Sequence, residues 1–260
     1  MQKTSLKPTQ NNKALITGAS SGIGYALANK YLSEGWQVIG IGRDKSKVED
    51  LINKFRNNFY FFEIDLTNFE KLEMNLSNIL ANHKDLNTII FNAGIYIPEN
   101  YENFSFKNAR QSFDINVLSV YFTIEILRKN IQLDYKHTLA IVSSVAGYRG
   151  LPKSILYGPT KAALINLCES LRIDLPKAVN IKLINPGFVD TPATSINNFK
   201  MPFLITAEKA ATVIFSRIYK KGFEISFPFP FNLMMKFGSI LPYKAYFKIT
   251  EYISKNEQKN

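Results

Sequence analysis

The sequence KALITGASSGIG at residues 13–24 decides the fold of this chain. Its first part, KALIT, is an apolar strand pattern, and the helix pattern YALANKYLSEG follows the last glycine directly. Glycine is needed in such a turn because the chain must leave the strand sharply and the backbone must approach a pyrophosphate closely. The N–H groups that open the following helix then face the phosphates. The turn therefore predicts a dinucleotide site formed by Gly18, Ser20, Ser21, Gly22, Ile23 and Gly24.

Short apolar runs alternate with helix patterns from residue 13 to about 227, without a Gly/Ser/Pro linker or a repeat. Several of these runs are apolar on both faces, which is typical of a parallel sheet covered by helices on each side. We therefore expect one doubly wound α/β domain of the Rossmann type with a mostly parallel seven-stranded sheet. The predicted strands are 13–18, 36–42, 59–65, 87–94, 137–144, 179–187 and 223–227, and the predicted helices lie near 22–34, 46–56, 68–82, 106–130, 155–174 and 207–220.

We expect three parts in the chain: a frayed amino end at 1–12, the dinucleotide-binding and catalytic domain at 13–227, and an extension at 228–260 packed on that domain. The stretch 222–250 is dense in Phe, Met, Leu and Pro, but none of its uncharged runs reaches the ~18–20 residues of a membrane span. Pro228, Pro230 and Pro242 break any long helix there. Two interpretations stay open: a mobile lid over an apolar substrate pocket, or a peripheral membrane contact.

Composition narrows the functional classes. The formal net charge is +11, but the chain has no run of five basic residues and no basic stripe interleaved with aromatics, so we expect no nucleic-acid partner. Cys168 is the single cysteine and the first twelve residues hold no apolar stretch for a signal peptide, which favours a reducing, cytoplasmic location. His83 and His137 show no metal-ligand spacing, and we expect no metal site.

Tyr157 and Lys161 are four residues apart, so they share one face of a helix. A tyrosine with a pKa near 10 is a poor acid–base catalyst at neutral pH, and a nearby ammonium is expected to lower that pKa. Pro159 stands between the two, and it is tolerated if the helix begins close to Tyr157.

The Gly-x-x-x-Gly-x-Gly spacing of the first turn, the triplet Asn92-Ala93-Gly94 and the pair Tyr157-x-x-x-Lys161 occur in this order. Together they resemble the short-chain dehydrogenase/reductase family over roughly residues 12–192. The resemblance implies a catalytic set of Ser144, Tyr157, Lys161 and Asn116, with Asn116 opening its helix and holding a water near the lysine. It also implies cofactor contacts at Asp65, Leu66, Asn92, Ala93, Gly94, Tyr157, Lys161, Pro186, Gly187, Val189 and Thr191. A homodimer or homotetramer packed through the helices around 106–130 and 155–174 is implied as well.

The end of the second predicted strand bears on which dinucleotide binds. An NAD site usually has Asp or Glu there to hold the ribose 2′-hydroxyl, whereas this chain has Gly42 followed by Arg43. A guanidinium can bind a 2′-phosphate in bidentate fashion, and Asp44 could point away from it. NADP(H) is therefore favoured, with NAD(H) as the other option.

The sequence thus predicts an NADP(H)-dependent oxidoreductase that interconverts a carbonyl and an alcohol. Tyr157 is the expected general acid/base, and Ser144 the expected hydrogen-bond partner of the substrate oxygen. The apolar extension suggests a small hydrophobic substrate. The alternative is a catalytically silent dinucleotide-binding sensor or scaffold, which would bind the cofactor and turn nothing over.

Overall fold

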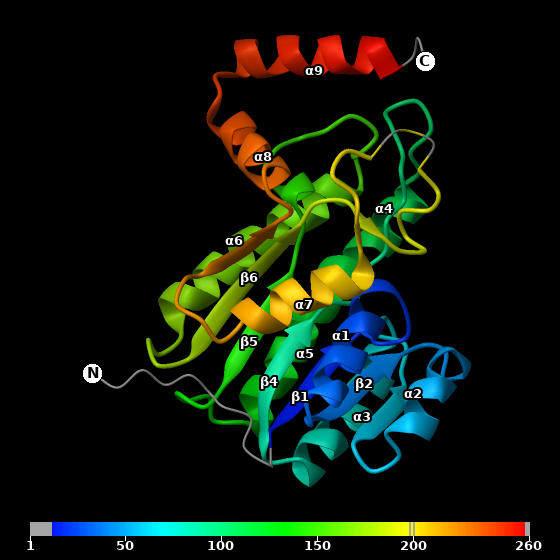
Figure 1. Cartoon of the computed structure of the whole chain (residues 1–260), viewed down its shortest axis with the longest axis vertical. Helices are drawn as coiled ribbons and strands as arrows, with labels where there is room; N and C mark the ends of the chain where they lie inside the picture. The colour runs from blue at the N-terminus through cyan, green and yellow to red at the C-terminus, as the bar shows by residue number, and fades with distance from the viewer. Residues whose placement is uncertain (1–11, 198, 200, 258–260) are drawn as a thin grey trace.

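A computed structural model describes residues 12–197, 199 and 201–257 of the chain, and its centre is one seven-stranded sheet (Figure 1). The strand order is β3-β2-β1-β4-β5-β6-β9, and every neighbouring pair is parallel. This confirms the predicted Rossmann-type α/β fold. The strands are β1 (Lys13–Thr17), β2 (Gln37–Gly42), β3 (Phe59–Glu63), β4 (Leu86–Phe91), β5 (Thr138–Val142), β6 (Asn180–Pro186) and β9 (Glu224–Phe227).

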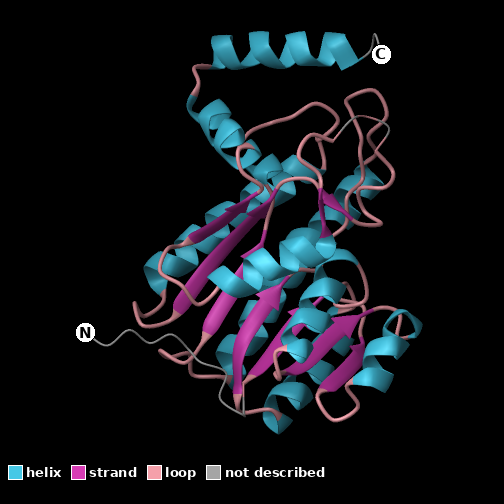
Figure 2. Cartoon of the chain, in the orientation of Figure 1, coloured by secondary structure: helices cyan, strands magenta, loops and turns pink. Residues whose placement is uncertain are grey.

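Helices cover both faces of the sheet (Figure 2). Alternation along β1 explains why: Ala14 and Ile16 belong to one apolar core, whereas Leu15 belongs to the other. The first core is completed by α1 (Gly22–Ser33), α2 (Glu49–Lys54) and α7 (Ala207–Arg217). The second core is completed by α3 (Phe69–Asn82), α5 (Ser119–Asn130) and α6 (Tyr157–Asp174). Because both faces are buried, the central strands read as continuous apolar runs.

The strand order reverses at β1, which lies between β2 and β4. In open α/β sheets, ligands bind in the crevice outside the carboxyl ends of the strands at such a switch point. The glycine turn follows β1 and Asn92 follows β4, so both predicted motifs lie at this crevice. The topology therefore brings together segments about 75 residues apart in the sequence.

The carboxyl-terminal extension forms two helices that were not predicted, α8 (Phe231–Ile240) and α9 (Tyr243–Glu257), on either side of Pro242. The prolines do prevent one long helix, but the stretch between Pro230 and Pro242 and the stretch after Pro242 are each long enough for a helix. Two further elements were not expected: the short pair β7 (Val189–Asp190) with β8 (Ile205–Thr206), and a π-helical turn at Asp114–Leu118 between α4 (Phe106–Phe113) and α5. No helix within the described ranges is long and apolar enough to cross a membrane.

Candidate active site

The glycine turn after β1 lines one end of a cleft. Gly18 has a φ of +70°, and a Cβ there would lie 2.8 Å from the Cα of Ala93. A Cβ on Gly24 would lie 2.1 Å from the carbonyl oxygen of Gly18. Ser21 precedes α1 but its side chain caps none of the helix N–H groups. The turn therefore offers bare backbone and a helix N-terminus, the arrangement that suits a pyrophosphate.

The cleft has a volume of about 320 Å³ and runs from the glycine turn past the carboxyl ends of the strands to the start of α8. Nearly all residues that the sequence predicted for the site line this single cleft. Gly24 and Asn116 lie behind its surface instead, as both are buried. The lining members are Gly18, Ser20, Ser21, Gly22, Ile23, Arg43, Asp65, Leu66, Asn92, Ala93, Gly94, Ser144, Tyr157, Lys161, Pro186, Gly187, Val189 and Thr191.

Hydrogen bonds hold the ends of β1 and β4 together at the cleft. The Asn92 side-chain amide donates to the carbonyl oxygen of Thr17 over 3.1 Å. The hydroxyl of Thr17 accepts from the backbone N–H groups of Asn92 and Ala93, at 3.0 and 3.1 Å. Asn92 therefore fixes the backbone of the glycine turn rather than presenting its side chain freely to a ligand.

The end of β2 is crowded at the position where an NAD site usually has an acidic side chain. A Cβ on Gly42 would lie 2.8 Å from the Ser20 hydroxyl and 2.9 Å from the ring of Phe61. Arg43 follows, exposed and lining the cleft. The Asp44 carboxylate accepts hydrogen bonds from the N–H and the hydroxyl of Ser46, and this lowers its pKa. Asp44 thus turns away from the cleft, and Arg43 is the charged side chain that β2 presents there.

The end of β3, which neighbours β2 in the sheet, lines the cleft next. Asp65 and Leu66 follow β3 and line the cleft. The Asp65 carboxylate accepts from the N–H and the hydroxyl of Thr67, at 2.9 and 2.8 Å. This local turn fixes the direction in which the chain leaves β3. Leu66 is buried beside it and offers an apolar surface.

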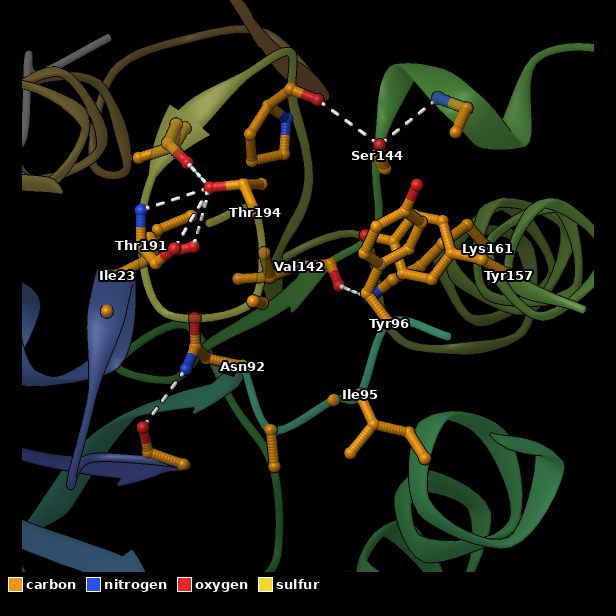
Figure 3. A pocket seen from close by; sticks show the side chains of 18 of the residues that line it. Ile23, Asn92, Ile95, Tyr96, Val142, Ser144, Tyr157, Lys161, Thr191 and Thr194 are labelled. Atoms are coloured by element: carbon orange, nitrogen blue, oxygen red, sulfur yellow. Dashed lines mark hydrogen bonds between the residues drawn. The ribbon is translucent and has the colours of Figure 1, made fainter. Parts of the chain in front are cut away.

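Ser144 and Tyr157 face each other at the other end of the cleft (Figure 3). Ser144 accepts from the N–H of Ala146 over 3.1 Å, which holds its hydroxyl at the end of β5. Burial raises the pKa of Tyr157 to about 12, while the nearby Ser144 hydroxyl acts in the opposite direction. In the chain without cofactor, burial therefore outweighs the lowering of this pKa that was expected from Lys161.

Lys161 lies almost fully buried beneath the tyrosine ring, with its Nζ 5.5 Å from the ring centroid. The Nζ donates to the carbonyl oxygen of Val142 over 3.0 Å (Figure 3), and burial lowers the lysine pKa to about 8. The hydroxyl of Ser143 donates to the Lys161 carbonyl oxygen over 2.7 Å. Both serines line the cleft, but the Ser143 hydroxyl anchors α6 to the end of β5, whereas Ser144 faces Tyr157.

The start of α6 explains how Pro159 is accommodated. α6 begins at Tyr157, so Pro159 lies in its first turn, where no N–H donor is missed. The hydroxyl of Ser154 accepts from the N–H of Gly158 over 3.0 Å, and Thr160 donates its hydroxyl to the Tyr157 carbonyl over 2.7 Å. The predicted helix start is confirmed, and Tyr157 and Lys161 share one face of α6.

Asn116 lies deeper than the sequence suggested. It sits inside the π-helical turn between α4 and α5, so it does not open a helix. Its side chain accepts from the N–H of Ile95 over 2.7 Å and donates to the Ile95 carbonyl and the Thr160 hydroxyl, at 2.9 and 3.0 Å. These three hydrogen bonds engage both the oxygen and the nitrogen of the Asn116 side-chain amide with other groups of the protein. Asn116 thus joins the loop after β4 to the first turn of α6.

Sequence reasoning missed the aromatic side chains of the cleft. The Tyr96 ring meets the ring of Tyr157 edge to face at 5.0 Å, and its hydroxyl donates to Asn197 over 3.0 Å. Phe231, the first residue of α8, stacks on Phe188 at 5.4 Å, and Phe188 also meets Phe199 at 5.9 Å. These rings come from loops and from the first residues of α6 and α8, and no short-range spacing in the sequence connects them.

The loop after β6 passes between the two ends of the cleft. The hydroxyl of Thr194 donates to the Val189 carbonyl over 2.6 Å and accepts from the N–H of Thr191 over 3.1 Å (Figure 3). Thr191 also packs beside Gly22, since a Cβ on that glycine would lie 3.1 Å from the methyl group of Thr191. Thr191 therefore lies opposite the glycine turn, and Val189 lines the same cleft.

Comparison with known proteins agrees with this geometry. A family model described as short chain dehydrogenase matches residues 12–200. An uncharacterized oxidoreductase of Myxococcus xanthus is 30% identical over 233 residues, covering 88% of this chain and 92% of that protein. Human dehydrogenase/reductase SDR family member 11 is 31% identical over 204 residues, covering 74% and 78%.

Solved structures share the fold at low sequence identity. A short-chain dehydrogenase from Streptomyces avermitilis superposes with a TM-score of 0.77 at 19% identity, covering 95% of this chain and 98% of the other. ElxO with NADP bound gives 0.72 at 23%, covering 83% and 97%. A short-chain dehydrogenase/reductase from Burkholderia phymatum in complex with NAD gives 0.73 at 22%, covering 83% and 88%.

Proposed function

Since the chain belongs to the short-chain dehydrogenase family and is an oxidoreductase of that type, we propose that it interconverts a hydrophobic carbonyl and its alcohol with NADP(H). One observation carries the proposal: Ser144, Tyr157 and Lys161 line the same cleft as the glycine turn. The bound nicotinamide would supply or accept the hydride. A dinucleotide-binding sensor would not need this polar set beside the cofactor, and no contact among the described residues favours one.

The residues of the glycine turn would hold the cofactor. Gly18, Gly22 and Gly24 keep the backbone open for the pyrophosphate, with the N-terminus of α1 directed at it. Asp65 and Leu66 would contact the adenine, and Pro186, Gly187, Val189 and Thr191 the nicotinamide end. Structures of fold neighbours contain NADP in one case and NAD in another, so the cofactor preference depends on this chain's own residues.

The surroundings of Arg43 favour NADP(H). Gly42 lacks the carboxylate that an NAD site would use, a side chain there would crowd Ser20 and Phe61, and the Asp44 carboxylate is hydrogen-bonded to Ser46. Arg43 remains at the cleft as a donor for a 2′-phosphate, to which a guanidinium can form two charge-assisted hydrogen bonds.

Tyr157 would act as the acid in the reduction direction. Its raised pKa keeps the hydroxyl protonated at neutral pH, and this is the form that can give a proton to a carbonyl oxygen. Ser144 would donate a hydrogen bond to the same oxygen and stabilise its developing negative charge. Lys161, directly beneath the ring, would hold Tyr157 and bind ribose hydroxyls.

The substrate would be apolar. Beyond Tyr157 the cleft is walled by Tyr96, Phe188, Phe199 and Phe231. Aromatic rings of this kind bury a chain or ring without demanding hydrogen bonds from it.

The test replaces Tyr157 with phenylalanine. A panel of apolar ketones and aldehydes is first screened for NADPH consumption with the unmodified chain. Tyr157→Phe should lower turnover of the best substrate by ~10²–10⁴-fold, the usual contribution of a positioned acid, with NADPH still bound. Tyr96→Phe removes a hydroxyl that points to Asn197 from the neighbouring ring, and should keep most of the turnover. Undiminished turnover in Tyr157→Phe would rule out this mechanism.

We also propose that the chain forms a homodimer or homotetramer through α4, α5 and α6. Phe113, Leu118 and Tyr121 lie at exposed positions along the α4–α5 segment, which is unusual for apolar side chains so close together. Analytical ultracentrifugation tests this directly. The cytoplasmic location expected from the sequence stays a prediction.

A further inference from the structure

Helices α8 and α9 form an arm at one end of the molecule. In Figure 1, α8 rises from the body on the side to which the carboxyl ends of the strands point, and α9 lies across the top, apart from the sheet. The arm is anchored by Arg149, whose guanidinium donates to the carbonyl oxygens of Gly238 and Ser239 at 2.9 and 3.2 Å. The same guanidinium lies 4.1 Å from the ring of Tyr246, in the first turns of α9. A cation at a helix C-terminus is favourable, so Arg149 holds α8 and α9 in place.

The outward side of α8 is apolar and uncovered. Leu233, Phe237 and Ile240 follow the i, i+4, i+7 spacing of one helix face, and Met234 lies beside them. Phe237 is 61% exposed and Ile240 is 77% exposed. The lysine of this helix, Lys236, does not interrupt the stripe, since it pairs with Glu224 of β9. Monomeric soluble proteins rarely expose a continuous apolar stripe of this kind without using it.

Helix α9 extends this surface with an amphipathic pattern. Lys244, Lys248 and Glu251 share one side at the i, i+4, i+7 spacing, and they are exposed. Apolar residues occupy most of the remaining circumference: Tyr243, Phe247, Ile249, Tyr252 and Ile253, all of them exposed. Aromatic and aliphatic side chains flanked by lysines are typical of helices that lie in the headgroup region of a bilayer.

The charge of the chain complements an anionic bilayer. The formal net charge is +11, so an anionic surface attracts the chain. Lys244 and Lys248 stand beside the apolar side chains, and basic residues in such positions are attracted to an anionic membrane surface. Long lysine side chains can also keep their ammonium groups among the headgroups while their stems cover apolar surface.

The arm is continuous with the cleft. Phe231 begins α8 and also forms the cleft wall with Phe188. The side chain of Phe203 is half exposed, and its ring centroid lies 6.2 Å from that of Phe231. From the exposed stripe of α8, apolar side chains therefore lead to the wall of the candidate active site. We propose that α8 and α9 bind the surface of an anionic membrane and present the mouth of the cleft to it. This goes beyond the proposed reaction and does not depend on it.

Vesicle flotation tests the proposal with the full chain. The protein should float with phosphatidylcholine vesicles that contain phosphatidylglycerol, and less with phosphatidylcholine alone or at raised salt. Met234→Asp with Tyr252→Asp places one charge on each helix of the arm and should abolish most of the binding. The matched control is Met74→Asp with Tyr135→Asp. Met74 and Tyr135 are 67% and 70% exposed outside the arm, against 59% and 70% for Met234 and Tyr252.

A second pair of variants tests the electrostatic part. Lys244→Gln with Lys248→Gln should weaken binding to anionic vesicles and leave the weak binding to phosphatidylcholine unchanged. Lys71→Gln with Lys84→Gln makes the same charge change at exposed positions on and after α3, and should keep the binding. Equal losses in both pairs would overturn the assignment to the arm.

Hydrogen–deuterium exchange of the unmodified chain gives a readout that no folding defect can imitate. Anionic vesicles should slow exchange in α8 and α9, with the amides of α3 unchanged. The proposal fails if the unmodified chain does not float, or if the two aspartate variants lose binding equally. It also fails if Met234→Asp with Tyr252→Asp splits a dimer in ultracentrifugation while the unmodified chain ignores vesicles, since a second copy would then cover the arm.

Discussion

The floor of the cleft and its carboxyl-terminal wall are built from different interactions. At the floor, Lys161 and Ser143 line the cleft and Asn116 lies behind them. All three are buried and held by hydrogen bonds to backbone or side-chain groups. At the wall, Phe231 is held by ring contacts and continues into a helix whose outer side is exposed. A polar floor of this kind fixes atoms at defined positions, because each broken hydrogen bond leaves a buried group unsatisfied. An apolar wall tolerates shape changes more readily.

The largest expected effect comes from the buried charge of the floor. The pKa of Lys161 falls from 10.5 to about 8 on folding, so between these values the unfolded chain binds more protons than the native chain. The free energy of unfolding therefore rises with pH in this window, and protonated Lys161 destabilises the native state below pH 8. At about 1.4 kcal/mol per pKa unit, the contribution is on the order of 3 kcal/mol.

Lys161→Met should accordingly gain stability relative to the unmodified chain at pH 7, and this gain should shrink by up to that amount as the pH approaches 10.5. Urea unfolding of the cofactor-free chain across the range measures the difference. Lys177→Met, at an exposed position, should show a difference that does not change with pH. A pH-independent difference for Lys161→Met as well would mean that this lysine keeps its ordinary pKa in the fold.

Arg43 tests the edge of the floor at the end of β2. Arg43→Ala should weaken NADPH binding by about 10- to 100-fold, since a hydrogen bond to a charged group is worth ~1.5–3 kcal/mol. NADH binding should be unchanged, because NADH has no 2′-phosphate. The control, Lys45→Ala, removes an exposed cation two residues further on that does not line the cleft. Isothermal titration with both cofactors decides; equal NADH and NADPH affinities in the unmodified chain would overturn the preference for NADP(H).

The difference between floor and wall also explains which features of the fold and the site could be predicted from the sequence. The glycine turn, the seven strands and the arrangement of Ser144, Tyr157 and Lys161 were predictable because each depends on local spacing or on strand ends that meet at one edge of the sheet. Ser144 and Tyr157 are thirteen residues apart, yet β5 and α6 bring them to the same cleft. Ser144 was expected there from the resemblance to the family, and its place at a strand end agrees with that expectation.

Other features depended on burial and on distant packing. The pKa of Tyr157 follows from its burial, which the spacing to Lys161 does not encode. Asn116 lies in a π-helical turn, and one extra residue in a helical turn leaves no clear periodic signal. The edge-to-face pair of Tyr96 with Tyr157 joins residues 61 positions apart through separate loops. In the extension, the prolines were correctly expected to break a long helix, but the shorter helices α8 and α9 between and after them were not predicted.

The smallest expected effect lies at the wall. Phe231→Leu keeps an apolar side chain but removes the stack on Phe188, and such ring pairs contribute ~0.5–1.5 kcal/mol beyond the area they bury. The KM for an apolar carbonyl substrate should therefore rise about 2- to 10-fold, with NADPH affinity unchanged because the floor is intact. Phe229→Leu is the matched control two residues earlier, since Phe229 is 76% exposed and does not line the cleft. Steady-state kinetics separate the two variants. If Phe231→Leu weakened NADPH binding as much as it raised KM, the wall and the floor would be one coupled unit, and the division of roles between them would be wrong.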